Sequence, residues 1–117
     1  MIGIGVDLVE VGRVRAALAR TPTLAGRLFT PAERAYAEAA KDPAERFAVR
    51  FAAKEAVMKA LGVGLGAVDW RDIEVVRAPS GAPSLVITGR AAALWLSRSS
   101  MRQISFPVGI SAQRTFP

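Results

Sequence analysis

RFAAKEAVMKALGVG, at residues 50–64, ends the longest helix that the sequence predicts. The segment DPAE at residues 42–45 begins this helix, because it places a capping aspartate before a proline and a glutamate. Gly62 ends it, since glycine readily adopts the left-handed conformation that follows a helix. Glu55 and Lys59 are four residues apart and therefore share one face. The pattern predicts a long helix that carries a carboxylate and an ammonium group near the boundary of the core.

Shorter elements are predicted on both sides of this helix. Apolar residues alternate with glycine at residues 2–6, which is typical of a short buried strand. The other predicted elements are a helix that ends near Arg20, a helix that begins with TPAE at 30–33, hairpin strands at 73–76 and 85–88, a helix at 89–97 and a strand at 104–111. This order predicts an α+β fold, in which a small antiparallel sheet packs with one long helix and several short ones.

The composition restricts the chemistry that the chain can perform. It contains no histidine and no cysteine, which excludes histidine general bases and Ser-His or Cys-His nucleophiles. The same absence argues against zinc, so metal chemistry would use carboxylates, which favour Mg²⁺ or Mn²⁺. The net charge of +6, from 16 basic and 10 acidic residues, favours anionic partners such as phosphate-rich cofactors and acidic proteins.

The length of the chain and the distribution of its charged residues limit how the chain can be organised. With 117 residues, the chain has room for one core, and we expect a single domain over residues 1–117. Charged residues interrupt every apolar stretch, so no membrane-spanning segment is predicted. The first residues lack the pattern of a signal peptide, and the absence of cysteine fits a cytoplasmic protein. The basic residues lack interleaved aromatic residues, so nucleic-acid binding is not expected.

A carboxylate at the end of the first predicted strand is the second candidate for chemistry. Asp7 either caps the following helix or binds a metal ion, and the Glu55–Lys59 pair is either a surface ion pair or part of a site. Asp7 and Glu55 together could hold Mg²⁺ with several waters and a substrate phosphate, beside the positive charge of Lys59. Gly62 and Gly64 could let backbone amides approach a phosphate, although they match no standard nucleotide motif.

Three segments together resemble the holo-acyl-carrier-protein synthase family of 4′-phosphopantetheinyl transferases. They are GIGVDLVEVGRV at 3–14, LFTPAERAYA at 28–37 and RFAAKEAVMKALGVG at 50–64, and the resemblance extends over roughly residues 1–90. It implies the fold of that family and the transfer of the phosphopantetheine arm of coenzyme A to a serine of an apo acyl carrier protein. The serine hydroxyl would attack the β-phosphate, and adenosine 3′,5′-bisphosphate would leave.

The resemblance also implies roles for individual residues. Asp7 and Glu55 match the magnesium ligands of the family, and Lys59 matches its lysine at the coenzyme A phosphates. Arg50 and Lys54 lie in its cofactor-binding block. Either a water near the metal or Glu55 itself would take the proton of the attacking serine, and the sequence leaves both possibilities open.

Two further expectations concern partners. Arg13 matches a family position that binds the acidic helix of the carrier protein. Arg20 lies on the same exposed stripe of the predicted helix that ends near it. The resemblance implies a homotrimer with active sites between neighbouring subunits. Whether the carrier protein belongs to fatty-acid or polyketide synthesis is left open by the sequence.

The end of the chain departs from the family pattern. Residues 98–117 contain no histidine, whereas family members carry an S-x-[ST]-H-[ST] turn before the closing strand. This departure supports a second interpretation, in which the domain binds coenzyme A or a carrier protein without turnover.

Overall fold

The structure is a computed structural model that describes residues 8–64, 66–77, 81, 83–97 and the backbone of 111–114. Asp7 and the strand predicted at residues 2–6 lie outside the described residues, as does most of the strand predicted at 104–111. The described elements are α1 (Leu8–Arg20), α2 (Leu24–Leu28), α3 (Pro31–Glu38), α4 (Pro43–Leu61), the 3-10 turn η1 (Trp70–Asp72), β1 (Ile73–Arg77), β2 (Pro83–Ile87), α5 (Gly89–Ser97) and β3 (Ser111–Arg114).

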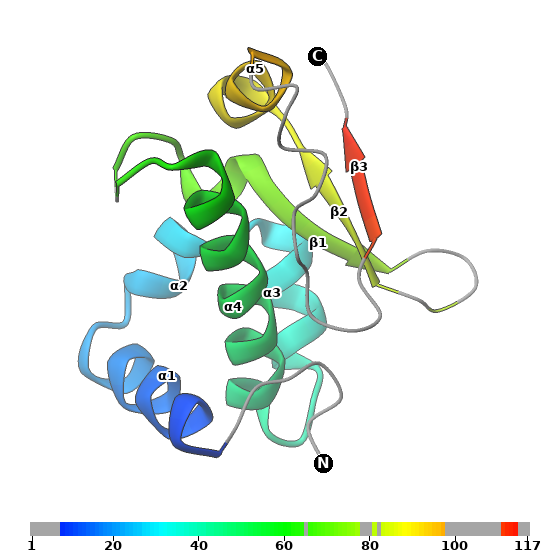
Figure 1. Cartoon of the computed structure of the whole chain (residues 1–117). Helices are drawn as coiled ribbons and strands as arrows, with labels where there is room; N and C mark the ends of the chain where they lie inside the picture. Colours follow the sequence, from blue (N-terminus) through cyan, green and yellow to red (C-terminus); the bar gives the residue numbers. More distant parts are fainter. Residues whose placement is uncertain (1–7, 65, 78–80, 82, 98–110, 115–117) are drawn as a thin grey trace.

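The helix α4 is the central element, as the sequence predicts. It lies between α1 on one side and the sheet on the other (Figure 1), and ten of its 19 residues are buried. Gly62 ends the helix in the left-handed conformation, with φ of 69°. The start differs in one detail, because Asp42 makes no capping bond to the helix and instead pairs with Arg15 of α1 at 2.5 Å.

The helix predicted to begin with TPAE is present as α3, and a capping box closes its start. The hydroxyl of Thr30 accepts a hydrogen bond from the backbone N–H of Glu33 at 3.2 Å, and the Glu33 carboxylate accepts one from the backbone N–H of Thr30 at 3.0 Å. Two backbone N–H groups that a helix start leaves without partners are thereby satisfied. The bonds fix the side chain of Glu33 at the junction of α3, α4 and β1.

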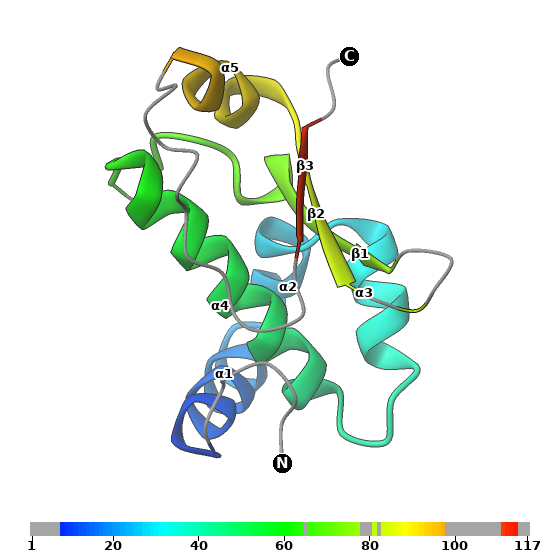
Figure 2. The same cartoon turned by 45° about the vertical axis from the view of Figure 1, so that its right-hand side comes forward.

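The sheet has the strand order β1-β2-β3. The predicted hairpin is confirmed, with β1 antiparallel to β2 and Ile73 opposite Ile87. The strand β3 runs parallel to β2, with Ser84 opposite Ser111, so the sheet is mixed rather than wholly antiparallel. A parallel pair needs a long crossover, and the chain between β2 and β3 includes α5, which lies beyond the end of the sheet (Figures 1 and 2).

The main core lies between α4, the sheet and α5. Its largest fully buried apolar side chains include Val57 and Leu61 of α4, Ile73 of β1, and Leu85 and Ile87 of β2. Two smaller apolar clusters lie where α4 packs against α1 and where it packs against α2 and α3. Within the part of the chain that the structure describes, no helix is both long and apolar enough to cross a membrane.

Candidate active site

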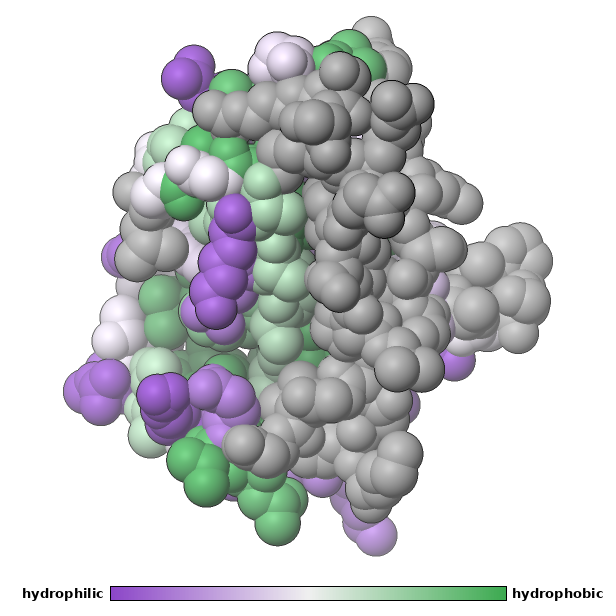
Figure 3. Space-filling model, in the orientation of Figure 1, coloured by the Kyte–Doolittle hydropathy of each residue, from purple (hydrophilic) through white to green (hydrophobic). Residues whose placement is uncertain are grey.

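Glu55 lies on the half-buried face of α4, in the walls of two neighbouring pockets. The first pocket has a volume of about 260 Å³ and lies between α1, α2 and α4. The second has a volume of about 190 Å³ and lies at the end of α4. The surface is hollowed between α1 and α4 in Figure 3. Glu55 is therefore the carboxylate that both hollows share.

The first pocket has an apolar floor and a charged rim. Its apolar residues include Leu18 of α1, Leu28 of α2 and Phe51 of α4, whereas Glu10 and Arg13 contribute the charges from α1. Arg13 donates to Glu10 at 2.9 Å, and both side chains remain accessible to solvent. Such a pocket can accept apolar side chains of a partner while its rim meets charged ones.

The second pocket combines a cation with an aromatic ring. Besides Glu55, it is lined by Lys59, Gly64 and Trp70, together with Met58 and Val63. The helical spacing predicted from the sequence therefore places Glu55 and Lys59 on one face, and Lys59 is exposed there. This pocket is suited to an anionic group next to an apolar one.

The surroundings of Glu55 favour the protonated form of its carboxyl. Burial raises the pKa of its carboxyl above the usual value, and the nearby carboxylate of Glu10 raises it further. Lys59 and Arg13 act in the opposite direction, with smaller effects. A divalent cation bound beside Glu55 would favour the ionised form of this carboxyl, against the effect of burial.

The described residues do not complete a metal site by themselves. No group of three or more acidic, histidine or cysteine side chains capable of holding a metal occurs within the described ranges. Asp7, the other expected ligand, lies outside those ranges, three residues before Glu10. One or two carboxylates with several waters are the usual ligands of Mg²⁺, so Glu55 and its surroundings fit the expected ion.

Gly62 and Gly64, the two glycines expected at the cofactor, lie differently with respect to the second pocket. Gly64 lines the second pocket, whereas Gly62 does not. The backbone N–H of Gly62 donates to the carbonyl of Lys59 at 3.0 Å, as part of the helix end. The Gly62 amide therefore has a partner within the helix end, and a contact of Gly62 with the cofactor stays a prediction.

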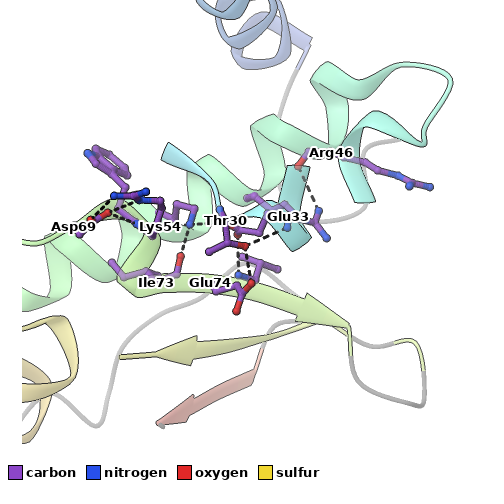
Figure 4. A network of polar contacts seen from close by, with 11 residues as sticks. Thr30, Glu33, Arg46, Lys54, Asp69, Ile73 and Glu74 are labelled. Carbon is purple, nitrogen blue, oxygen red and sulfur yellow. Dashed lines mark hydrogen bonds and ion pairs between the residues drawn. The ribbon is translucent and has the colours of Figure 1, made fainter. Parts of the chain in front are cut away.

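Lys54 is fully buried, which corrects the expectation that it contacts a cofactor. Its ammonium group pairs with the Glu33 carboxylate at 2.8 Å and donates to the carbonyls of Trp70, at 3.0 Å, and Ile73 (Figure 4). Burial lowers the pKa of Lys54, and the Glu33 carboxylate counteracts this effect. Removing either partner would leave a buried charge uncompensated, at a cost of about 3–5 kcal/mol.

Arg50 lies away from Glu55, on the opposite side of α4. Its side chain is 5% exposed, lines neither pocket and lies over the ring of Tyr36 at 4.3 Å from the ring centre. Arg46 and Arg77 lie over the same ring, at 4.0 and 5.2 Å. Burial lowers the pKa of Arg50. One chain therefore presents two separate features, the Glu55 pockets and this arginine cluster of Arg46, Arg50 and Arg77.

The stripe predicted on the first helix is exposed. Arg13 lies at the rim of the first pocket and Arg20 lies in the last turn of α1, and both are accessible to solvent. The first turn of α1 also exposes two large apolar side chains, Leu8 and Val9. In Figure 3, apolar surface is visible at the lower end of the molecule, where α1 begins.

Two contributors to the site carry no clear signal in the sequence. The rings of Phe51 and Trp70 stack with centroids 5.1 Å apart and an angle of 14° between their planes. The Glu33 carboxylate uses one oxygen in the capping box, whereas the other accepts from the backbone N–H of Val75 at 2.9 Å. Only the capping half of the Glu33 interaction can be recognised from the TPAE pattern.

The match to known proteins extends over nearly the whole chain. Residues 3–109 match the 4′-phosphopantetheinyl transferase superfamily. The chain belongs to this superfamily. Within it, the holo-[acyl-carrier-protein] synthase of Moorella thermoacetica is 48% identical over 91 residues, which cover 78% of this chain and 71% of that relative.

Solved structures in the superfamily share the fold. The crystal structure of holo-[acyl-carrier-protein] synthase from Neisseria meningitidis matches with a TM-score of 0.64 and 36% identity, over 86% of this chain and 81% of the other. The acyl carrier protein synthase of Plasmodium yoelii, solved with ADP bound, matches with a TM-score of 0.62 and 30% identity, over 83% and 76% of the two chains. The family and the transferase fold expected from the sequence are confirmed.

Proposed function

We propose that the protein is a holo-[acyl-carrier-protein] synthase, which transfers the 4′-phosphopantetheine arm of coenzyme A to a serine of an apo acyl carrier protein. Membership of the superfamily along almost the whole chain carries this conclusion. The arrangement of Glu55 and Lys59 beside two pockets supports it, because phosphoryl transfer depends on positioning and on electrostatic stabilisation.

Lys59 is the residue that stabilises the phosphates. Its ammonium group is exposed on the wall of the second pocket, one helical turn from Glu55. A positive charge at this place would compensate the negative charge that develops on the leaving adenosine bisphosphate. The ADP in the Plasmodium yoelii structure belongs to the same class of ligand, a nucleotide with a pyrophosphate group.

Glu55 is the proposed magnesium ligand, together with Asp7. When bound, the ion would supply Lewis-acid polarisation of the pyrophosphate. The raised pKa of Glu55 means that a proton competes with the ion for this carboxylate. The proton of the attacking serine would pass either to a water or to Glu55.

The carrier protein would dock on α1. Arg13 and Arg20 offer exposed positive charge on this helix, and the net charge of +6 attracts an acidic partner at a distance.

Assembly as a homotrimer would bring the two separate features of the chain together. Arg50 lies apart from the Glu55 pockets within one chain, so we propose that it serves a cofactor bound between neighbouring subunits. Light scattering at micromolar concentration tests this directly, and a monomer mass would refute it.

The decisive experiment uses coenzyme A, Mg²⁺ and a panel of apo carrier proteins from fatty-acid and polyketide systems. Mass spectrometry should show one phosphopantetheine arm added to at least one of them. Binding of coenzyme A without transfer to any carrier would favour the second interpretation, a domain that binds without turnover.

A further inference from the structure

The buried ion pair between Glu33 and Lys54 lies directly behind the wall that carries Glu55. A lysine ammonium group has three N–H donors, and those of Lys54 are directed to Glu33, Trp70 and Ile73 (Figure 4). Both ends of the turn η1 are thereby attached to α4, since Trp70 begins the turn and Ile73 follows it.

Both oxygens of the Glu33 carboxylate also accept hydrogen bonds or an ion pair. One oxygen of Glu33 accepts from Lys54 and from the backbone N–H of Thr30, and the other accepts from the backbone N–H of Val75. The pair therefore connects α3, α4, η1 and β1 through a single buried site. Both side chains have an exposure of 0%, so water does not compete for these bonds.

The attachment of Trp70 has a consequence at the surface. The Trp70 ring stacks on Phe51, and these two rings belong to the walls of the two pockets that share Glu55. Lys54 and Glu55 are neighbours on α4, so anchoring Lys54 inward fixes the rotation that directs Glu55 outward.

We propose that Glu33 and Lys54 are positioning residues of the transferase site, which hold Trp70 against Phe51 and thereby set the geometry of the wall around Glu55 and Lys59. The inference rests on the proposed transfer reaction and deepens it. A pair that only stabilised the fold would affect melting and activity together, whereas a positioning pair affects turnover in molecules that are fully folded.

The experiment starts from Trp95→Phe, which leaves Trp70 as the single tryptophan of the chain. In this parent, Lys54→Met removes the ammonium group and keeps an unbranched side chain. The double variant Glu33→Gln with Lys54→Met removes both charges, so that neither is left buried and alone. Leu85→Ala is the matched control, because Leu85 is fully buried in β2 and lines neither pocket.

The melting temperature of each variant is measured first. Acrylamide quenching of Trp70 and transfer kinetics are then measured at a temperature at which the variant is folded. For Lys54→Met we expect kcat to fall about tenfold to a hundredfold, as small displacements at a reacting centre can do. The KM for the carrier protein should stay unchanged, and quenching of Trp70 should increase. The double variant should melt at a higher temperature than Lys54→Met, yet it should regain neither kcat nor protection of Trp70, because no donor holds the Trp70 carbonyl.

The proposal fails if folded Lys54→Met keeps the parental kcat and quenching. It also fails if Leu85→Ala loses kcat to the same extent, or if the double variant recovers turnover together with stability. If Lys54→Met does not fold, the double variant decides the question by the same measurements. A parent that transfers to no carrier protein would refute the proposed function, and the quenching of Trp70 would still decide whether Lys54 holds that residue.

Discussion

Phe51 and Trp70 stack on each other, and each lines one of the two pockets on which Glu55 lies. The two residues come from α4 and from η1, which are joined by a turn at Gly62 and a loop. The stacked rings therefore connect the hollow facing α1 with the hollow at the end of α4.

Trp70→Leu tests this contact. The lost stacking should destabilise the fold by about 0.5–1.5 kcal/mol, beyond the change in buried area. Turnover should fall because the wall beside Glu55 loses its support, while Trp95→Phe should leave turnover unchanged. Urea unfolding and transfer kinetics check both expectations, and unchanged kcat in Trp70→Leu would contradict a role for the stacked rings.

The raised pKa of Glu55 predicts how stability depends on pH. The folded state holds the proton more tightly than the unfolded state, so ionisation of Glu55 near neutral pH costs stability. Glu55→Gln should therefore melt higher than the wild type at pH 7, and this advantage should vanish below the ordinary pKa of a glutamate. Mg²⁺ should raise the melting temperature of the wild type and leave that of Glu55→Gln unchanged. A variant that melts lower than the wild type at pH 7 would contradict the prediction.

Asp7→Asn tests the second magnesium ligand. Asparagine caps a helix about as well as aspartate, so the fold should be retained while metal binding is lost. Transfer should fall on the order of a hundredfold to a thousandfold, as it does when one group that stabilises a transition state is removed. The check is transfer kinetics with a titration of Mg²⁺. Wild-type turnover in this variant, or full wild-type activity in excess chelator, would rule out the assignment.

Arg13→Glu tests the docking of the carrier protein on α1. Reversal of an exposed charge turns an attraction into a repulsion, so the KM for the carrier protein should rise about tenfold, and less at high salt. The KM for coenzyme A should change little. Arg90→Glu is the matched control, since it makes the same change at an exposed position on α5. Equal effects of the two reversals would show that only the overall charge matters.

Thr30→Ala tests the capping box. It removes the acceptor for the N–H of Glu33 and the hydroxyl that donates to the Glu74 carboxylate at 2.6 Å. We expect a loss of about 1–2 kcal/mol in the free energy of unfolding. Thr30→Ser keeps the hydroxyl and should lose much less, which denaturant titration would measure.

The sequence correctly predicts the features that depend only on residues close to one another along the chain. The capping box of Thr30 and Glu33 and the glycine at the end of α4 follow from neighbouring residues, and the Glu55–Lys59 face follows from helical spacing. The order of α1, α3, α4, the β1–β2 hairpin and α5 follows from the same periodicities and indicates the fold class, whereas the short helix α2 and the turn η1 are not predicted.

Lys54 shows why the rest could not be predicted. Its spacing from Arg50 resembles that of an exposed cationic row, yet its partner Glu33 lies 21 residues earlier and its acceptors Trp70 and Ile73 lie 16 and 19 residues later. Such long-range pairs depend on how α3, α4 and η1 pack, which periodicity does not record. The parallel direction of β3 depends likewise on the path of the crossover.

The bond from Val75 to Glu33 also protects the sheet. Among the strands that the structure describes, β1 is an outer strand of the order β1-β2-β3, and the backbone amides on its outer side could pair with an extended chain. The N–H of Val75 instead donates to the buried Glu33 carboxylate, and α3 packs beside the strand. At β1, α3 and the bonded N–H of Val75 would therefore hinder pairing with a strand from another molecule. This arrangement disfavours edge-to-edge aggregation on this side of the sheet.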